Sequence, residues 1–383
     1  MSVNNKVPEI RFKGFSGEWY EVALSSVIDI RSGKDYKHLG KGNIPVYGTG
    51  GYMLSVDSAL SNDDDAIGIG RKGTIDKPCI LRAPFWTVDT LFYAVPFPGF
   101  NLDFLFCLFQ KIEWKKHDES TGVPSLSKIA INNVSVYATN ELEQTAIGNY
   151  FQKLDSLINQ HQQKHDKLSS IKKAMQEKMF PKQGETMPEI RFKGFSGEWQ
   201  QREFSDIATR VSTHHQSTCL PCVEYEDIVA GKGRFNKDIH QKKTFKAGLK
   251  FEADDVLFGK LRPYLKNWFL ADFEGLAIGD FWVLRANNVA STFLFSLIQT
   301  NKFELISNLS AGSKMPRSDW GLVSSSCFFV PKNISESYEI GNYFQKLDAL
   351  INQHCSGQQK LATALEFFQN NRSDSFGVKP PLY

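Results

Sequence analysis

The chain has 383 residues, of which 41% are hydrophobic and 23% are charged, a balance that predicts two or three folded domains and excludes a mainly disordered protein. No apolar run approaches the roughly 18 residues that cross a bilayer, the N-terminal residues lack a signal-peptide core, and six cysteines are too few for a disulfide framework, so we expect a reducing, cytoplasmic location. The net charge of +3 is too small to indicate nucleic-acid binding by itself.

Two segments of the chain occur twice, almost without change. Residues 8–19, Pro-Glu-Ile-Arg-Phe-Lys-Gly-Phe-Ser-Gly-Glu-Trp, recur as residues 188–199, and we call each copy an opener. Residues 147–161 recur as 340–354 with one difference, Ser156 against Ala349. The interiors between these repeats hardly resemble each other. The pattern indicates a duplication with unchanged flanks and diverged interiors, and it argues against a solenoid, which needs at least three shorter repeats.

The two interiors predict a mixture of strands and helices. Short runs rich in β-branched and aromatic residues, separated by Gly and Pro, are typical of strands. In the first interior we expect strands at 44–47, 66–69 and 90–95, a buried helix at 102–112, and an exit from the fold over 129–137. In the second we expect strands at 222–226, 255–258, 281–284 and 327–330, and a helix at 292–305.

A heptad pattern after each interior predicts a long helix. Apolar or aromatic residues recur at steps of four and three from Ile147 and from Ile340, over about four heptads. Asn140-x-x-Glu143 and the equivalent Asn333-x-x-Glu336 have the spacing of a capping box. A stripe this long favours antiparallel pairing of the two helices; the alternative is that each helix packs only on its own domain. The residues predicted to pair are Ile147, Phe151, Leu154, Ile158, Ile340, Phe344, Leu347 and Ile351, with His161 and His354 also in the seam.

These elements predict an α+β protein with two mixed α/β domains and two long antiparallel helices, related by a pseudo-twofold axis. The predicted boundaries are 1–139 for the first domain, 140–182 for the central helix, 183–332 for the second domain, 333–371 for the distal helix and 372–383 for a C-terminal tail.

The sequence carries no recognisable catalytic signature. It has no G-x-x-x-x-G-K-[ST] phosphate loop, no Asp/Asn-Pro-Pro-aromatic tetrapeptide, no G-x-S-x-G elbow and no H-E-x-x-H motif. We therefore predict that the chain is not an enzyme by itself. The nearest approach to a metal site is His214-His215 followed by Cys219 and Cys222, but no second Cys-x-x-Cys accompanies it, so we predict an ordinary loop and no metal.

Loops that combine glycine with lysine or arginine are the best candidates for binding. Glycine lets the backbone approach a phosphate, and Arg or Lys adds charge-assisted hydrogen bonds; Arg also has the shape for a bidentate contact to guanine. Such loops include Gly70-Arg-Lys-Gly73, Gly259-Lys-Leu-Arg262 and Gly312-Ser-Lys-Met-Pro-Arg317. The alternative for each loop taken singly is a solvated turn.

The whole arrangement resembles the specificity (S) subunits of type I restriction–modification systems. The openers carry the resemblance most clearly, together with the helix starts at Glu143 and Glu336 and the stretches at 44–51, 69–73, 85–90, 258–264 and 314–317. One departure is Ser337, where the first copy has Gln144, which weakens the match at the second helix start.

The resemblance implies a non-catalytic DNA-specificity subunit. Each domain would read one half of a split, asymmetric site on double-stranded DNA, and the helices would fix the gap. Two methyltransferase (M) subunits, carrying S-adenosylmethionine, would dock on the repeated parts and methylate adenine. Two restriction (R) subunits would use ATP and Mg to cleave unmodified DNA, and phage DNA mimics could occupy the groove. No cofactor would bind this chain.

The site residues implied by this reading fall into two sets. For DNA they are Lys34, Tyr47, Thr49, Arg71, Lys72, Thr121, Arg234, Lys260, Arg262, Tyr264, Lys266, Lys314 and Arg317. For the M subunits they are Phe12, Phe15, Trp19, Tyr150, Phe192, Phe195, Trp199 and Tyr343. The alternative functions are a protein-interaction scaffold without DNA specificity and a self-contained methyltransferase or nuclease.

Overall fold

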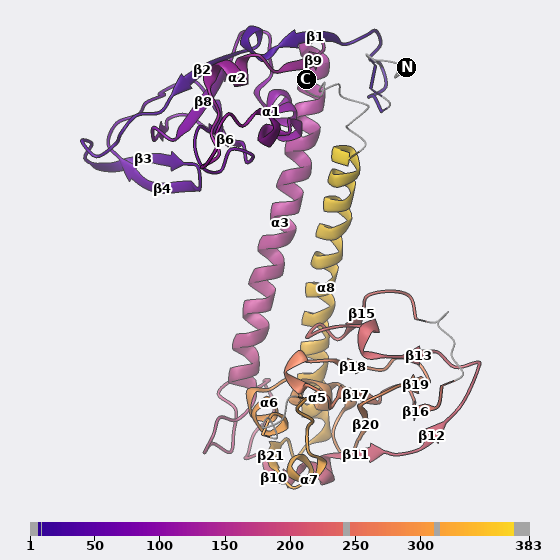
Figure 1. The fold of residues 1–383 in the computed structure, drawn as a ribbon. Coiled ribbons are helices and arrows are strands. Elements are labelled where there is room, and N and C mark those ends of the chain that lie inside the picture. The colour runs from indigo at the N-terminus through magenta and orange to yellow at the C-terminus, as the bar shows by residue number, and fades with distance from the viewer. Residues whose placement is uncertain (1–6, 9, 240–245, 310–314, 371–383) are drawn as a thin grey trace. The chain divides into compact units, whose positions relative to one another are not determined.

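The computed structural model describes residues 7–8, 10–239, 246–309 and 315–370, and it confirms the mixed helix and strand content (Figure 1). The chain divides into two compact units. The first unit ends at Gln160 and resumes at Gly357, and the second unit runs from His161 to Ser356. Each long helix therefore contributes residues to both units.

The first unit contains two sheets and a separate strand pair. The larger sheet is antiparallel throughout, in the order β2 (Ile28–Ser32), β8 (Leu91–Pro96), β5 (Ala66–Gly70), β6 (Cys79–Leu81). The second has the order β4 (Gly51–Val56), β3 (Lys41–Gly48), β7 (Trp86–Thr87), with β3 and β7 parallel. The strand β1 (Tyr20–Ala23), which follows the opener, pairs with β9 (Ser135–Ala138) and so brings the two ends of the interior together.

Helices cover one side of the larger sheet in the first unit. They are α1 (Leu102–Lys111), α2 (Lys128–Asn132) and the 3-10 turns η1 (Leu24–Ser26) and η2 (Trp114–His117). Asn101 starts α1, since its side chain accepts a hydrogen bond from the Phe104 amide at 3.0 Å. The shared core includes Trp19, Phe104, Phe109 and Trp114, all at most 1% exposed.

The second unit repeats this plan. Its larger sheet has the order β11 (Ala208–Val211), β20 (Phe281–Ala286), β17 (Val256–Gly259), β18 (Trp268–Leu270), antiparallel throughout. The strand β10 (Gln200–Glu203) pairs with β21 (Cys327–Val330), as β1 does with β9. The other strands are β12 (His214–His215), β16 (Gly248–Phe251), β19 (Gly275–Ala277) and β13 (Cys222–Val223) in one sheet, and the pair β14 (Ile228–Val229) and β15 (Arg234–Phe235).

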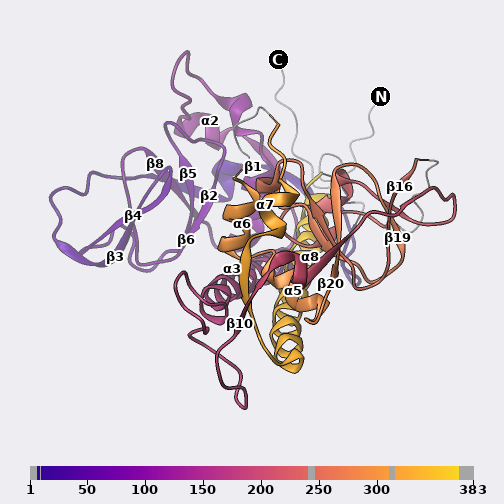
Figure 2. The same cartoon turned by 90° about the horizontal axis from the view of Figure 1, so that it is seen from below.

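One helix and one strand of the second unit differ from expectation. The short helices of this unit are α4 (Phe204–Ile207), α5 (Ser291–Leu297), α6 (Asn301–Ser307) and α7 (Trp320–Ser324), with 3-10 turns η3 (Tyr225–Asp227) and η4 (Pro263–Leu265). Figure 2 shows α6 beside α7. The single helix expected over 292–305 is two helices, because Thr300 caps α6. The strand expected over 222–226 ends at Val223, because Glu224 and Asp227 form a capping box that starts η3.

The long helices are α3 (Glu141–Met179) and α8 (Ile334–Asn370). In the first unit Ile147, Phe151 and Leu154 of α3 are buried in the domain core, and Leu361 and Leu365 of α8 pack against the same core. In the second unit the core buries Ile340, Phe344 and Leu347 of α8, and Leu168, Ile171 and Met175 of α3 pack against it. Each helix start is therefore buried in the core of its own domain, and residues from the second half of the other helix pack against the same core.

Polar contacts set the direction of the two helix segments in the second unit. Nδ1 of His161 lies 3.1 Å from Nδ1 of His354, and Nζ of Lys172 lies 2.6 Å from the Asp348 carboxylate. As α3 advances, its partners in α8 move back along the chain, so these segments run antiparallel. Ile351 is buried and Ile158 is half-buried.

None of the helices in the described residues is long and apolar enough to cross a membrane. None of the six cysteines, all of which lie in the described residues, is paired in a disulfide bond.

Candidate nucleic-acid interface

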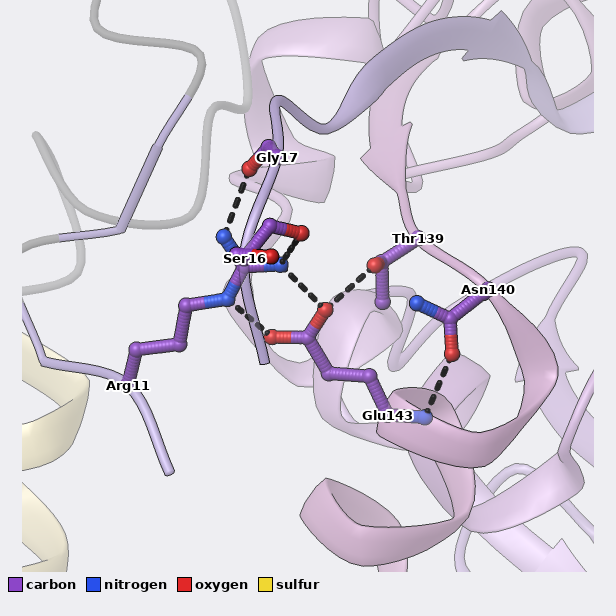
Figure 3. Close-up of polar contacts among 6 residues, drawn as sticks. All are labelled: Arg11, Ser16, Gly17, Thr139, Asn140 and Glu143. Atoms are coloured by element: carbon purple, nitrogen blue, oxygen red, sulfur yellow. Dashed lines mark hydrogen bonds and ion pairs between the residues drawn. The ribbon is translucent and has the colours of Figure 1, made fainter. Parts of the chain in front are cut away.

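Each opener is fixed to the start of the long helix that follows its interior. In the first unit the Arg11 guanidinium forms two hydrogen bonds with the Glu143 carboxylate, at 2.6 and 2.7 Å, and also donates to the carbonyl oxygens of Ser16 and Gly17 (Figure 3). The Glu143 side chain is 1% exposed and also accepts a hydrogen bond from the Thr139 hydroxyl. The bond to Glu143 raises the pKa of Arg11 above its ordinary value. We call this cluster the opener–helix lock.

The second unit contains the same opener–helix lock. The Arg191 guanidinium forms two hydrogen bonds with Glu336 and donates to the carbonyls of Ser196 and Gly197. The indole of Trp199 adds a hydrogen bond to Glu336 at 3.3 Å. A bidentate pair in these buried surroundings tolerates little change in either side chain.

The lock corrects the predicted capping boxes. Asn140 does cap α3, since its side chain accepts from the Glu143 amide at 3.0 Å, but the Glu143 carboxylate turns to Arg11 and not back to the helix start. In α8 the Asn333 side chain accepts from Ser335, and Glu336 likewise faces Arg191. The sequence already held the missed signal, because an arginine and a glutamate recur at equivalent positions of both copies.

The difference between Gln144 and Ser337 turns out to preserve one interaction. The Gln144 carbonyl accepts a hydrogen bond from the Asn101 amide at 3.0 Å, at the start of α1. The Ser337 hydroxyl accepts from the Ala290 amide at 2.9 Å, at the start of α5. The shorter Ser337 side chain therefore meets the backbone donor that is equivalent to the one Gln144 meets, although the residue type departs from the pattern of the first copy.

The aromatic residues expected to bind partners divide into buried and accessible ones. Trp19 and Trp199 are 1% and 2% exposed within the domain cores, so their place in the fold is that of core residues, and partner binding by them stays a prediction. Phe12 packs edge-on against Tyr150, with ring centres 5.5 Å apart, and Phe192 packs likewise on Tyr343. Phe15 and Phe195 are half-buried. A cavity of about 140 Å³ opens beside Phe12, between the first opener and α3.

The glycine-plus-cation loops of the two units are held by equivalent backbone hydrogen bonds. In the first unit the Gly73 amide donates to the Pro124 carbonyl at 2.8 Å, and the Leu126 amide donates to the Arg71 carbonyl at 2.9 Å. In the second unit Arg262 donates to Pro316 at 2.7 Å, and Ser318 donates to Lys260 at 2.8 Å. We call residues 71–73 with 124–126, and residues 260–262 with 316–318, the loop frames.

These bonds give a residue-by-residue equivalence between the loop frames. Arg71 corresponds to Lys260, Lys72 to Leu261, Gly73 to Arg262 and Ser125 to Arg317. An isolated β-bridge joins Lys72 to Ser125 in the first unit, and an equivalent bridge joins Leu261 to Arg317 in the second. The same backbone therefore presents different side chains in the two units.

In the first unit several predicted DNA-binding residues form hydrogen bonds with one backbone segment, residues 87–90. The Lys34 amide donates to Thr87, the Val88 amide donates to Tyr47, and Arg71 donates to Thr90 through its amide and to Asp89 through its side chain. Lys34, Arg71, Lys72 and Thr121 are exposed, whereas Tyr47 and Thr49 are half-buried. These residues therefore include a set of exposed cations beside the loop frame.

In the second unit Asp280 organises the equivalent set. Its carboxylate lies 3.0 Å from the Arg317 guanidinium and 3.6 Å from the Lys260 ammonium. Its carbonyl accepts a hydrogen bond from the Tyr225 hydroxyl, which in turn accepts from the Leu261 amide. Burial raises the pKa of Tyr225, so its hydroxyl stays a donor. Sequence reasoning missed Asp280 and Tyr225, because no local pattern links them to the loop frame.

The remaining predicted DNA-binding residues lie in different settings. Tyr264 is 51% exposed, and Lys266 forms an ion pair with Glu304 at 2.8 Å. Arg234 is half-buried and donates to Sγ of Cys355 on α8, and its role in DNA binding stays a prediction. Lys314 lies outside the described residues.

The predicted absence of a metal site can be examined only in the described part of the chain. There, no three His, Cys, Asp or Glu side chains gather as metal ligands. His214 and His215 are exposed on β12, while Cys222 is buried.

Comparison with known proteins finds a family model that matches part of the chain and solved structures that resemble the whole chain. A family model described as "Type I restriction modification DNA specificity domain" matches residues 16–170. No curated protein sequence matches the chain. The crystal structure of a type I restriction–modification system S subunit from M. genitalium matches 98% of this chain and 100% of its own length, with 12% sequence identity and a TM-score of 0.71. The HsdS subunit from Thermoanaerobacter tengcongensis matches 94% of this chain and 96% of its own, with 13% identity and a TM-score of 0.39.

Proposed function

We propose that the whole chain is a DNA-specificity subunit with two recognition domains, because residues 16–170 match the model of the type I restriction–modification DNA specificity domain. The duplicated openers and locks support the same role for the second unit, whose larger sheet has the equivalent strand order. Each domain would read one half of a bipartite, asymmetric DNA site.

The observation that carries this proposal is the pair of loop frames. Equivalent backbone hydrogen bonds hold loops whose side chains differ, with Arg71 and Lys72 in one unit and Lys260, Arg262 and Arg317 in the other. Arginine and lysine supply both phosphate contacts and contacts to base edges. Two frames with unlike side chains are suited to two unlike half-sites.

The repeated flanks suit the proposed assembly role. Two identical methyltransferase subunits need two equivalent surfaces, and the openers with Phe12–Tyr150 and Phe192–Tyr343 supply them. In this proposal the paired helices form an antiparallel coiled coil that fixes the gap between half-sites. The methyltransferase subunits would carry S-adenosylmethionine and methylate a flipped adenine, and restriction subunits with ATP and Mg would cleave unmodified DNA. The chain itself would catalyse nothing.

Sequence-specific binding by the assembled complex tests the proposal. The full chain is purified with its methyltransferase subunits, and a random duplex pool is selected by electrophoretic shift. Recovery of one bipartite motif supports the specificity subunit. Binding without sequence preference supports the alternative, a scaffold with duplicated docking helices. Methyl transfer by the chain alone would show that it is an enzyme.

A further inference from the structure

Arg262 has a positive backbone φ angle, and the equivalent residue of the first unit, Gly73, also has a positive φ. Gly73 has φ +93°, and Arg262 has φ +50° in the left-handed region. A Cβ atom opposes this conformation, whereas glycine adopts it freely. The backbone frame would therefore be less strained with glycine at position 262, so the fold gives no reason for an arginine there. This points to a use for the side chain.

The Arg262 side chain is also poorly satisfied within the protein. Its Nε is buried, and in the described part of the chain it has no hydrogen-bond partner. A buried donor without an acceptor is unfavourable, and the guanidinium cannot escape by losing its proton. An acceptor oxygen from outside the protein that meets the rest of the guanidinium group would give this side chain a partner.

The charges around Arg262 define the chemistry of that acceptor. Lys260, Arg262, Lys266 and Arg317 bring four positive charges to the loop frame and η4, where Asp280 pairs with Lys260 and Arg317, and Glu304 pairs with Lys266. Four cations gathered on adjacent loops favour an anionic ligand. A phosphate oxygen is both an anion and a strong acceptor.

From this geometry we propose that Arg262 binds a backbone phosphate of the second half-site and thereby anchors the loop frame on DNA. A base edge in the major groove lies up to about 8.5 Å deep and requires a projecting side chain. Arg262 is half-buried with its Nε inside the domain, whereas Tyr264 and Arg317 beside it are exposed. The inference rests on the proposed function, because it takes DNA as the ligand.

Three substitutions separate the side chain from the backbone strain. Arg262→Gly removes the guanidinium and the strain, Arg262→Ala removes the guanidinium and keeps the strain, and Arg262→Lys keeps the charge without the fork. Lys332→Ala removes one exposed positive charge after β21, outside the loop frame, as a control. Binding of the complex with methyltransferase subunits to a labelled duplex carrying its methylated site is measured from 50 to 300 mM salt.

Phosphate binding predicts about tenfold weaker affinity for Arg262→Gly and Arg262→Ala, a smaller loss for Arg262→Lys, and no loss for Lys332→Ala. The slope of log affinity against log salt falls by about one, while the methylated sequence stays the same. Arg262→Gly unfolds at a higher urea concentration than Arg262→Ala.

Three results would overturn the inference: unchanged affinity and slope in Arg262→Gly, loss of one specified base in the methylated motif, or a glycine variant less stable than the alanine variant. A wild-type complex without a preferred sequence would instead refute the proposed function, so the two failures are distinguishable.

Discussion

The opener–helix lock and the loop frame are each built twice, but the lock keeps its side chains while the loop frame changes them. The lock is made by side chains, because Arg11 and Arg191 grip buried carboxylates from equivalent openers. The loop frame is made by backbone amides and carbonyls, which remain available whatever side chain a residue carries. A molecule with two identical partners and two different DNA half-sites would need this division.

The largest effect is expected from breaking the lock in one unit. Glu143→Ala leaves the Arg11 guanidinium, whose side chain is 13% exposed, without its carboxylate, and such a loss typically costs about 3–5 kcal/mol. Glu336→Ala is expected to act alike in the second unit. Urea unfolding measures the loss, with the exposed Glu141→Ala on the same helix turn as control. A change no larger than in the control would contradict the role of the lock.

The next largest loss of stability is expected at two glycines where the long helices lie close to a short helix of their own domain. A Cβ on Gly341 would lie 2.1 Å from Oγ1 of Thr292 and 2.5 Å from the Phe293 amide nitrogen, and one on Gly148 would lie 2.6 Å from Oδ1 of Asn101. Gly341→Ala is therefore expected to destabilise by about 1–3 kcal/mol, and Gly148→Ala by somewhat less. In an uncrowded helix interior alanine would instead stabilise the protein by about 1 kcal/mol. A lower midpoint of thermal unfolding in the alanine variants would therefore support the close contact, and a higher midpoint would contradict it.

The exchange of Gln144 for Ser337 offers a finer test. Ser337→Ala removes the acceptor of the buried Ala290 amide, with an expected loss of about 1 kcal/mol. Ser337→Thr keeps the hydroxyl and serves as the matched variant. Equal stability of the alanine variant and the wild type would show that the two starts are not equivalent.

The smallest effect concerns the facing histidines. Burial, and then His161, Lys164 and His165, lower the pKa of His354, while Arg234 approaches the same helix at Cys355. The unfolded chain, with a histidine pKa near 6.5, binds more protons than the folded one just below that pH. The contribution of His354 to the free energy of unfolding is thus fully present above about pH 6.5, and it decreases as the pH falls below that value. His354→Gln should flatten this dependence in urea unfolding at pH 5 to 8; an unchanged slope would exclude the histidine.

The sequence predicted the duplication, the helix periodicity and several strands of the interiors, because these depend on local patterns. It placed β3, β5, β8 and α1 closely, at 44–47, 66–69, 90–95 and 102–112, but it missed β1, β2 and β4. The breaks at Thr300 and Val223 depend on single capping side chains, which periodicity does not register.

The common plan of the two units could not be read from the sequence. The interiors share strand order and loop hydrogen bonds without sharing residues, since backbone pairing constrains side chains weakly. The candidate site shows the same limit. Arg71, Lys260 and Arg317 could be proposed from their residue type and neighbouring glycines, whereas Asp280 and Tyr225 lie beside the loop frame only because the chain folds back on itself. The glycine-plus-cation pattern that selected Arg234 does not say which way its side chain points, and the structure places that side chain beside Cys355 of α8.

The central claim is that the two interiors are interchangeable readers on one plan, and replacing one by the other tests it most directly. Residues 20–138 are replaced by this chain's own residues 200–330, from the start of β10 to the end of β21, so that the junctions fall on equivalent strands. The modified bases of a host that expresses this variant with its methyltransferase subunits are then sequenced. The account predicts methylated sites that carry the second half-site at both ends. A folded, assembled variant that still methylates the original asymmetric site would contradict it.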